Sequence, residues 1–349
     1  MTDRGTWLRM NTDEQKSKAK RAANRLDDFQ QRHQGLGYPI AVYRKYSDDQ
    51  AGNLANLLAY WAFFSIFPLL LVAITIMGFV GIGNGTFKNV LTTLPIIGEG
   101  IKSQNGLSSG NPVALVVGIL VALWSGLGVF NTAQTAFDSV WEIPMAERPG
   151  LVDKLVRSLK ALVVLGIGFV VTLGLSVVAT GGSAINIHLP LVLRLVVGLA
   201  TVALDVAGFC LGYSFLTKRD LTFRQVLPGA VFAGVLFFLL QLGGSALVSH
   251  GAQGHTGATS SIATVLGLLW WFSLQAQVVL YGAEINVVKV EKLWPRGLVD
   301  APDTPADHRA YAAYVEEKAF RPNQSVDTSF HDEVSDAEKA SGGWRRDQD

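Results

Sequence analysis

The chain of 349 residues is 49% hydrophobic and only 16% charged, and its net charge of +1 averages a basic beginning and an acidic end. Its single cysteine, Cys210, excludes a disulfide framework, a cysteine-based zinc site and an iron–sulfur cluster within one chain. A bilayer core takes about 20 apolar residues per helix. Four stretches without any charged residue are long enough for at least one such helix each, which excludes an ordinary soluble protein: 50–87, 103–137, 161–193 and 225–283.

The first fifty residues are polar, with ten Lys and Arg against five Asp and Glu in residues 1–46. We expect residues 1–50 to be a basic cytoplasmic N-terminal segment. Within it, residues 14–32 form either an exposed helix that touches anionic lipid or a solvated charged segment. The first apolar run begins too far along the chain for a secretory signal peptide, so it should stay in the membrane.

Apolar runs over residues 51–290 predict a transmembrane domain. These runs do not alternate polar and apolar residues as barrel strands do, and backbone groups in lipid must be satisfied within each segment. The predicted fold class is therefore all-α, a polytopic membrane helical bundle of about six transmembrane helices. The expected helices are Leu57–Gly83, Val113–Thr135, Ser158–Thr180, Leu189–Leu216, Val226–Val248 and Ile262–Lys289.

Orientation follows from the Lys and Arg residues of the short connections. The connections near 148–160 and 218–224 are basic, whereas 181–188 and 249–261 contain no Lys or Arg. Basic connections stay in the cytoplasm. The alternation predicts that the N and C termini are both cytoplasmic.

The end of the chain, residues 291–349, is the third predicted region. Residues 300–349 hold six Lys and Arg against twelve Asp and Glu, together with several Pro, Asn, Ser and Gly. We expect an acidic, largely disordered cytoplasmic tail, in which only Ala306 to Phe320 forms a short helix.

Three motifs carry a resemblance to a known family. The stretch from Asn56 to Leu70 contains Ala-Tyr followed by Ser-Ile-Phe-Pro-Leu, residues 224–230 end in Leu-Pro-Gly-Ala, and residues 282–286 read Gly-Ala-Glu-Ile-Asn. In order and spacing they resemble the YihY/BrkB family of bacterial inner-membrane proteins. The resemblance spans roughly Ala41 to Val290, and the long polar ends are similar to the YhjD branch.

The resemblance implies a multi-pass protein of the bacterial plasma (inner) membrane that is concerned with envelope integrity. Export of a lipid or solute is suspected for the family, and its members once carried the label ribonuclease BN. A reaction is not implied by the resemblance.

Asp205 is the strongest candidate for a functional residue inside the membrane. A charge at the bilayer centre costs on the order of 3 kcal/mol or more, and Asp205 is flanked by apolar residues near the middle of the predicted fourth helix. It is either a protonatable coupling residue or substrate ligand, or a hydrogen-bonded residue that fixes helix packing. Gln241 on the fifth helix is the expected uncharged partner.

A second candidate set consists of polar stripes near the cytoplasmic ends of three helices. They predict a cavity open to the cytoplasm, or else hydrogen bonds of about 0.6–2 kcal/mol that hold helices together. Pro68 removes one backbone hydrogen bond from the first predicted helix and predicts a kink there, which acts as a hinge or only helps the helix to pack. The stripes are Asn53, Asn56 and Tyr60; Asn131, Gln134 and Asp138; and Gln277, Tyr281 and Glu284.

Small residues predict close helix packing, as at the GxxxG pair Gly208 and Gly212. Such faces serve folding within one chain or a homo-oligomer.

No enzyme signature is present, and we expect no catalytic residue, metal or cofactor. A phosphate-binding loop is missing from the sequence, and a ribonuclease would need a basic RNA surface and a metal-holding cluster. The leading hypothesis is a non-enzymatic membrane protein that transports or handles a lipid or amphipathic envelope component, with membrane lipids as partners and no nucleic acid. The alternative is a structural scaffold, and a ribonuclease is the least favoured reading.

Overall fold

The computed structural model describes most of the chain between residues 34 and 330. The described residues are 27, 34–80, 112–179, 190–251, 258–297, 304–326 and 328–330. Every regular element within them is helical, which confirms the predicted all-α class. Two compact units are distinguished, and each is described by itself. The terminal unit draws on residues 1–45, 142–148 and 287–349, and the membrane unit on 46–141 and 149–286.

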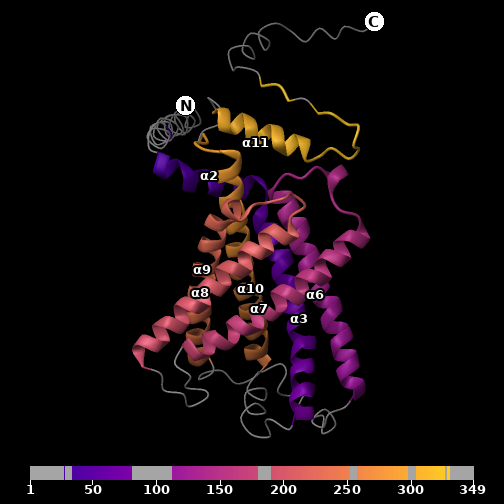
Figure 1. Cartoon of the computed structure of the whole chain (residues 1–349), viewed down its shortest axis with the longest axis vertical. Coiled ribbons are helices and arrows are strands. Elements are labelled where there is room, and N and C mark those ends of the chain that lie inside the picture. The colour runs from indigo at the N-terminus through magenta and orange to yellow at the C-terminus, as the bar shows by residue number, and fades with distance from the viewer. Residues whose placement is uncertain are drawn as a thin grey trace, which may run out of the picture. The chain divides into compact units, whose positions relative to one another are not determined.

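The membrane unit is built from the helices that the apolar runs predict. The described part of the chain contains six helices of 26 residues or more, which run through one bundle (Figure 1). The predicted ends at Gly83, Thr180 and Leu189 lie outside the described residues. The helices are α3 (Ala51–Val80), α6 (Pro112–Val140), α7 (Leu151–Ala179), α8 (Leu191–Leu216), α9 (Phe223–Gly251) and α10 (Ala258–Glu291), the last residues of which belong to the terminal unit.

Length and apolar composition identify membrane spans among these helices. Over the described residues, four segments are long and apolar enough to cross a bilayer. The chain is therefore a helical membrane bundle, and the exact number of spans and their orientation stay predictions. The four segments are Leu115–Val140, Leu195–Leu216, Phe223–Gly244 and Val265–Glu291.

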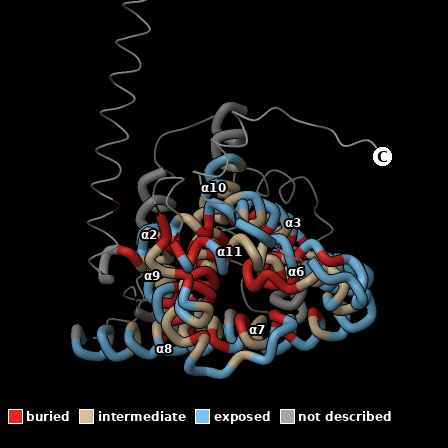
Figure 2. Tube along the Cα trace, turned by 90° about the horizontal axis from the view of Figure 1, so that it is seen from above, coloured by how far each residue is buried: buried red, intermediate tan, exposed pale blue. Residues whose placement is uncertain are grey.

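The bundle turns apolar side chains outward. Helix α3 packs against α6, α7 against α8, and α8 against α9. Figure 2 shows exposed residues along the outer sides of α7 and α8. On α8 these include Val192 and Leu199, which are 72% and 71% exposed. Large apolar surfaces of this kind are stable against lipid, which is the environment that the sequence predicts.

The described residues of the terminal unit form three short elements. They are α2 (Gln34–Asp48), which runs on into the membrane unit, the 3-10 turn η1 (Met145–Glu147) and α11 (Pro305–Glu316). Helix α11 begins with a capping box, in which Thr304 Oγ1 accepts the N–H of Asp307 and the Asp307 carboxylate accepts the N–H of Thr304. Pro305 at the first helical position favours the same start. This helix corresponds to the short helix predicted within the tail.

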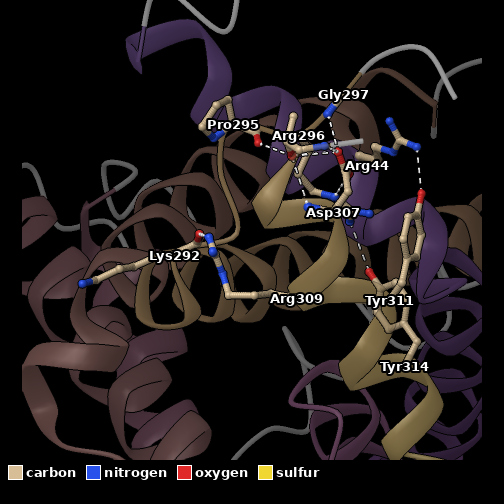
Figure 3. Close-up of polar contacts among 10 residues, drawn as sticks. Arg44, Lys292, Pro295, Arg296, Gly297, Asp307, Arg309, Tyr311 and Tyr314 are labelled. Carbon is tan, nitrogen blue, oxygen red and sulfur yellow. Dashed lines mark hydrogen bonds and ion pairs between the residues drawn. The ribbon is translucent and has the colours of Figure 1, made fainter. Parts of the chain in front are cut away.

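A buried ion pair holds the start of α11 (Figure 3). Arg296, which is fully buried, donates from Nε to Asp307 Oδ1 at 2.9 Å. Asp307 Oδ2 also accepts the N–H of Gly297 at 2.9 Å and the Oγ1–H of Thr304 at 2.8 Å. Burial alone would raise the pKa of Asp307, but the hydrogen bonds from Gly297, Arg296 and Thr304 outweigh it and hold the pKa below its usual value.

Further contacts tie the three segments of the terminal unit together. Arg44 Nη2 donates to Tyr311 Oη at 2.9 Å (Figure 3), and Arg148 pairs with Glu317 at 2.6 Å. The N–H of Met145 donates to the carbonyl of Glu317 at 3.0 Å. The tail for which the sequence predicts mostly disorder thus contains a segment, residues 304–320, with specific polar partners. Those partners are far away in sequence, so composition alone does not reveal them.

Candidate functional site

Helix α8 has a polar inner face and an apolar outer face. Asp205 lies near the middle of the helix and is only 7% exposed. Thr201, one turn before it, is fully buried, and Tyr213 and Thr217 continue the same face toward the end of the helix. Leu199 and Leu204 point outward. The structure therefore places Asp205 inside the bundle, at the middle of a buried polar stripe.

Helix α9 approaches α8 closely beside Asp205. A Cβ atom added to Gly234 would lie 2.7 Å from Val206 Cγ2 and 2.9 Å from the backbone nitrogen of Val206. The two backbones are nearly in contact there, because glycine leaves no side chain between them. Gln241 lies on the same helix α9 and is half-buried. The pairing of Asp205 with Gln241 stays a prediction.

A polar junction joins α6, α7 and α8. Gln134 of α6 is fully buried and donates from Nε2 to Ser158 Oγ at 2.6 Å and to the carbonyl of Lys154 at 3.2 Å. Asp138, one turn later on α6, is fully buried and accepts the N–H of Lys218 just after α8. Two members of the predicted stripe on α6 therefore lie inside the bundle, whereas Asn131 is exposed.

Two cations of α7 complete this junction. Lys154 Nζ donates to Thr135 Oγ1 of α6 at 3.2 Å. Arg157 Nη1 donates to the carbonyl of Thr217, directly after α8, at 3.0 Å. The sequence marks both residues only as signals of orientation, and their inward contacts depend on which face of α7 meets its neighbours.

The stripes on α3 and α10 are linked by hydrogen bonds. Ser273 Oγ donates to Asn56 Oδ1 at 2.7 Å, and Gln277 Nε2 donates to Ser273 Oγ at 3.3 Å. Tyr60 is 49% exposed and packs against other aromatic rings of α3. Pro68 is buried, and α3 continues through it as one helix.

Further along α10, toward its C-terminal end, aromatic and acidic side chains lie close together. The rings of Tyr46 and Tyr281 stack with centroids 3.9 Å apart and planes 4° from parallel. Glu284 is fully buried. Burial first, and then Tyr281 and Glu284, raise the pKa of Tyr46 to about 12, so its hydroxyl stays protonated at neutral pH. These contacts account for part of the predicted stripes, and the predicted cavity stays a prediction.

Two glycines mark a close crossing of α9 and α10. A Cβ atom on Gly229 of α9 would overlap the carbonyl oxygen of Gly282 of α10, and one on Gly282 would overlap the hydroxyl of Tyr213. Around them, the N–H of Gly229 donates to Asn286 Oδ1 at 2.7 Å, and Tyr213 Oη donates to the carbonyl of Val279 at 2.7 Å. The second and third family-like motifs of the sequence therefore meet at one backbone contact.

Within this chain, the predicted GxxxG pair gives no close contact at Gly208, and its use in a homo-oligomer stays a prediction. No neighbouring helix or side chain of the described chain lies within 4 Å of a Cβ added to Gly208, and the nearest such atom to one at Gly212 is Leu165 Cδ1 at 3.8 Å. Small-residue spacing indicates where helices could approach, and the actual crossing depends on partners far away in sequence. Among the described residues, no group of three or more His, Cys, Asp or Glu side chains is arranged to hold a metal ion.

The long apolar helices and the buried polar groups between them define a multi-pass helical membrane protein. The family model described as Virulence factor BrkB matches residues 42–305, more than half of the chain. The chain belongs to this family, which confirms the resemblance found in the sequence.

Named relatives agree with this assignment. The UPF0761 membrane protein PSHAa0171 of Pseudoalteromonas translucida is 27% identical over 286 residues, covering 78% of this chain and 91% of the relative. The UPF0761 membrane protein PA0951 of Pseudomonas aeruginosa is 26% identical over 275 residues, covering 75% of this chain and 65% of the relative, just under two thirds. YfkH of Bacillus subtilis, whose name calls it ribonuclease-like, is 22% identical over 263 residues, covering 71% of this chain and 93% of the relative. No solved structure matches this chain.

Proposed function

We propose that this protein transports or handles a lipid or another amphipathic envelope component in the bacterial plasma membrane. The observation that carries the proposal is the buried polar stripe of α8 with Asp205 at its middle. Thr201 and Asp205 face the bundle interior at 0% and 7% exposure, while the outer face of the same helix is apolar. The polar side chains of such a stripe can bind a polar headgroup or a proton inside the membrane, where the surrounding hydrocarbon cannot.

The free energy required to place Asp205 inside the membrane supports a functional role for this residue. A charged side chain at the centre of a membrane helix is unfavourable by about 2.5–3.5 kcal/mol on insertion scales. An apolar side chain at this position would be buried in the bundle without that cost. A carboxyl group that binds and releases a proton is able to couple movement of a substrate to the proton gradient.

A structural scaffold is the second candidate function. The glycine contact between α9 and α10 favours it, because such close backbone contacts give a rigid bundle. Ribonuclease activity is the least favoured reading. The ribonuclease-like name belongs to the Bacillus relative, and the inward cations Lys154 and Arg157 do not form an exposed RNA surface.

Asp205→Asn separates transport from scaffolding, because it keeps size and hydrogen bonding and removes the exchangeable proton. In a strain that lacks this protein and shows an envelope defect, the variant should reach the membrane at normal level yet fail to restore survival. We expect survival to be at least about tenfold lower than with the wild type, because a transport rate lowered by about 1.4 kcal/mol of barrier is already tenfold slower. Survival is measured as colony counts under envelope stress, beside membrane levels from immunoblots.

Asp220→Asn is the matched control, because Asp220 is exposed in the connection between α8 and α9. It should restore survival like the wild type. Full rescue by a normally expressed Asp205→Asn protein would remove the main support for transport and favour the scaffold.

A further inference from the structure

Two cations of α7 lie at the α6–α7–α8 junction, and no carboxylate of the described chain pairs with them. Lys154 and Arg157 are half-buried, and they donate hydrogen bonds to neutral oxygens, Lys154 to Thr135 Oγ1 and Arg157 to the carbonyl of Thr217. Neither cation forms an ion pair with any residue that the structure describes. Asp138, the buried acid of the junction, accepts the backbone N–H of Lys218. Neutral acceptors satisfy hydrogen bonds without cancelling charge, so the junction offers two cations to an anion.

The same junction also presents an acceptor for which the described residues supply no donor. Gln134 is fully buried, and both of its donated bonds are directed to α7, at Ser158 Oγ and at the carbonyl of Lys154. Its Oε1 atom is buried and has no hydrogen-bond partner within the described chain. Buried acceptors are almost always satisfied in proteins. A ligand here should therefore carry a hydroxyl or similar donor in addition to a negative charge.

An apolar face begins beside these polar groups. Leu151, Leu155 and Leu159 recur every four residues on α7 and are 88%, 53% and 47% exposed. They lie on one side of the helix, next to the turn that carries Lys154. A ligand with long hydrocarbon chains covers this face, whereas a small anion leaves it uncovered.

We propose that this junction binds an anionic phospholipid whose headgroup carries a free hydroxyl, as in phosphatidylglycerol. The phosphate lies against Lys154 and Arg157, the headgroup hydroxyl donates to Gln134 Oε1, and the acyl chains follow the leucines of α7. Basic sites between membrane helices on the cytoplasmic side recognise lipid headgroups in this way. The binding goes beyond the proposed function, because a protein that does not transport lipid can still hold this one.

The test measures binding of a fluorescent phosphatidylglycerol to the full-length protein in mild detergent by anisotropy. Unlabelled phosphatidylglycerol should compete, and phosphatidylcholine and glycerol phosphate should not. The double variant K154Q/R157Q should bind about 30-fold more weakly, as expected from the loss of two headgroup cations. The control K160Q/R224Q removes two exposed cations and should stay within about twofold of the wild type, because exposed charges are screened.

The competition experiment needs no variant, so it decides the question even if K154Q/R157Q does not fold. Phosphatidylcholine that competes as well as phosphatidylglycerol would overturn the proposal. Glycerol phosphate that competes as well as phosphatidylglycerol would show that the site binds a free anion. An equal loss of affinity in K160Q/R224Q would show that only the net charge of the protein matters. Either result would refute lipid binding at this junction. The survival phenotype of Asp205→Asn does not enter this measurement, so the two proposals fail separately.

Discussion

Gly229→Ala is expected to prevent the membrane unit from folding to its native packing. The added methyl group would overlap the carbonyl oxygen of Gly282, and Asn286 Nδ2 would lie only 2.6 Å from it. A backbone carbonyl cannot move aside as a flexible side chain does, so α9 and α10 must separate and break the bond from the Gly229 N–H to Asn286. We expect a loss of at least about 3 kcal/mol.

The measurement is the melting temperature and the size-exclusion profile of the detergent-purified protein. Gly208→Ala is the control, since it adds the same methyl group in α8 where nothing described lies within 4 Å. Alanine also favours a helix interior over glycine, so this control should be as stable as the wild type or slightly more stable. A Gly229→Ala protein as stable as Gly208→Ala would show that the two backbones are not in contact.

Asp307→Ala is expected to release α11 from the rest of the terminal unit. The substitution leaves the fully buried guanidinium of Arg296 without its carboxylate and removes the acceptor for Gly297 and Thr304. Breaking a buried ion pair from one side costs about 3–5 kcal/mol. Limited proteolysis should cut the variant faster between residues 297 and 330. Glu316→Ala, an exposed acid at the end of the same helix, should digest like the wild type, and equal digestion of both variants would contradict this account.

The pKa of Asp307 gives the pH dependence of this contact. Because the pKa in the folded protein lies below the usual value, the stabilisation is present above the usual pKa. It is lost as the pH falls through the lower folded value, where the carboxylate becomes protonated. The difference in protease resistance between wild type and Asp307→Asn should therefore be full at pH 7 and shrink only below about pH 4.

The bundle was largely predictable because lipid imposes a simple rule on sequence. A span must be apolar, long and helical, so runs such as Val113–Thr135 and Leu189–Leu216 predict α6 and α8 within a few residues at the ends that the structure describes. Hydropathy does not say which helix face meets which neighbour. The crossing at Gly229 and Gly282 and the open position of Gly208 therefore required the three-dimensional arrangement.

The candidate site was predictable only in part for the same reason. The cost of a carboxyl group in lipid identifies Asp205, and the structure places it on the inner face of α8. Lys154 and Arg157 looked like ordinary signals of orientation, because their inward contacts depend on the rotation of α7 about its axis. The order in the tail depends on contacts between residues that are apart in sequence. Arg296 and Asp307 are 11 positions apart, Arg44 and Tyr311 are 267 apart, and Arg148 and Glu317 are 169 apart.

Transbilayer movement of a labelled phospholipid in reconstituted vesicles tests the proposed lipid handling most directly. Vesicles that contain the wild-type protein should move the lipid from one leaflet to the other at least about tenfold faster than protein-free vesicles, a change of roughly 1.4 kcal/mol in the barrier. The rate is followed by chemical quenching of the label in the outer leaflet, with a proton gradient and without one. A rate equal to that of protein-free vesicles under both conditions, from protein whose melting temperature shows that it is folded, would contradict transport of phospholipid.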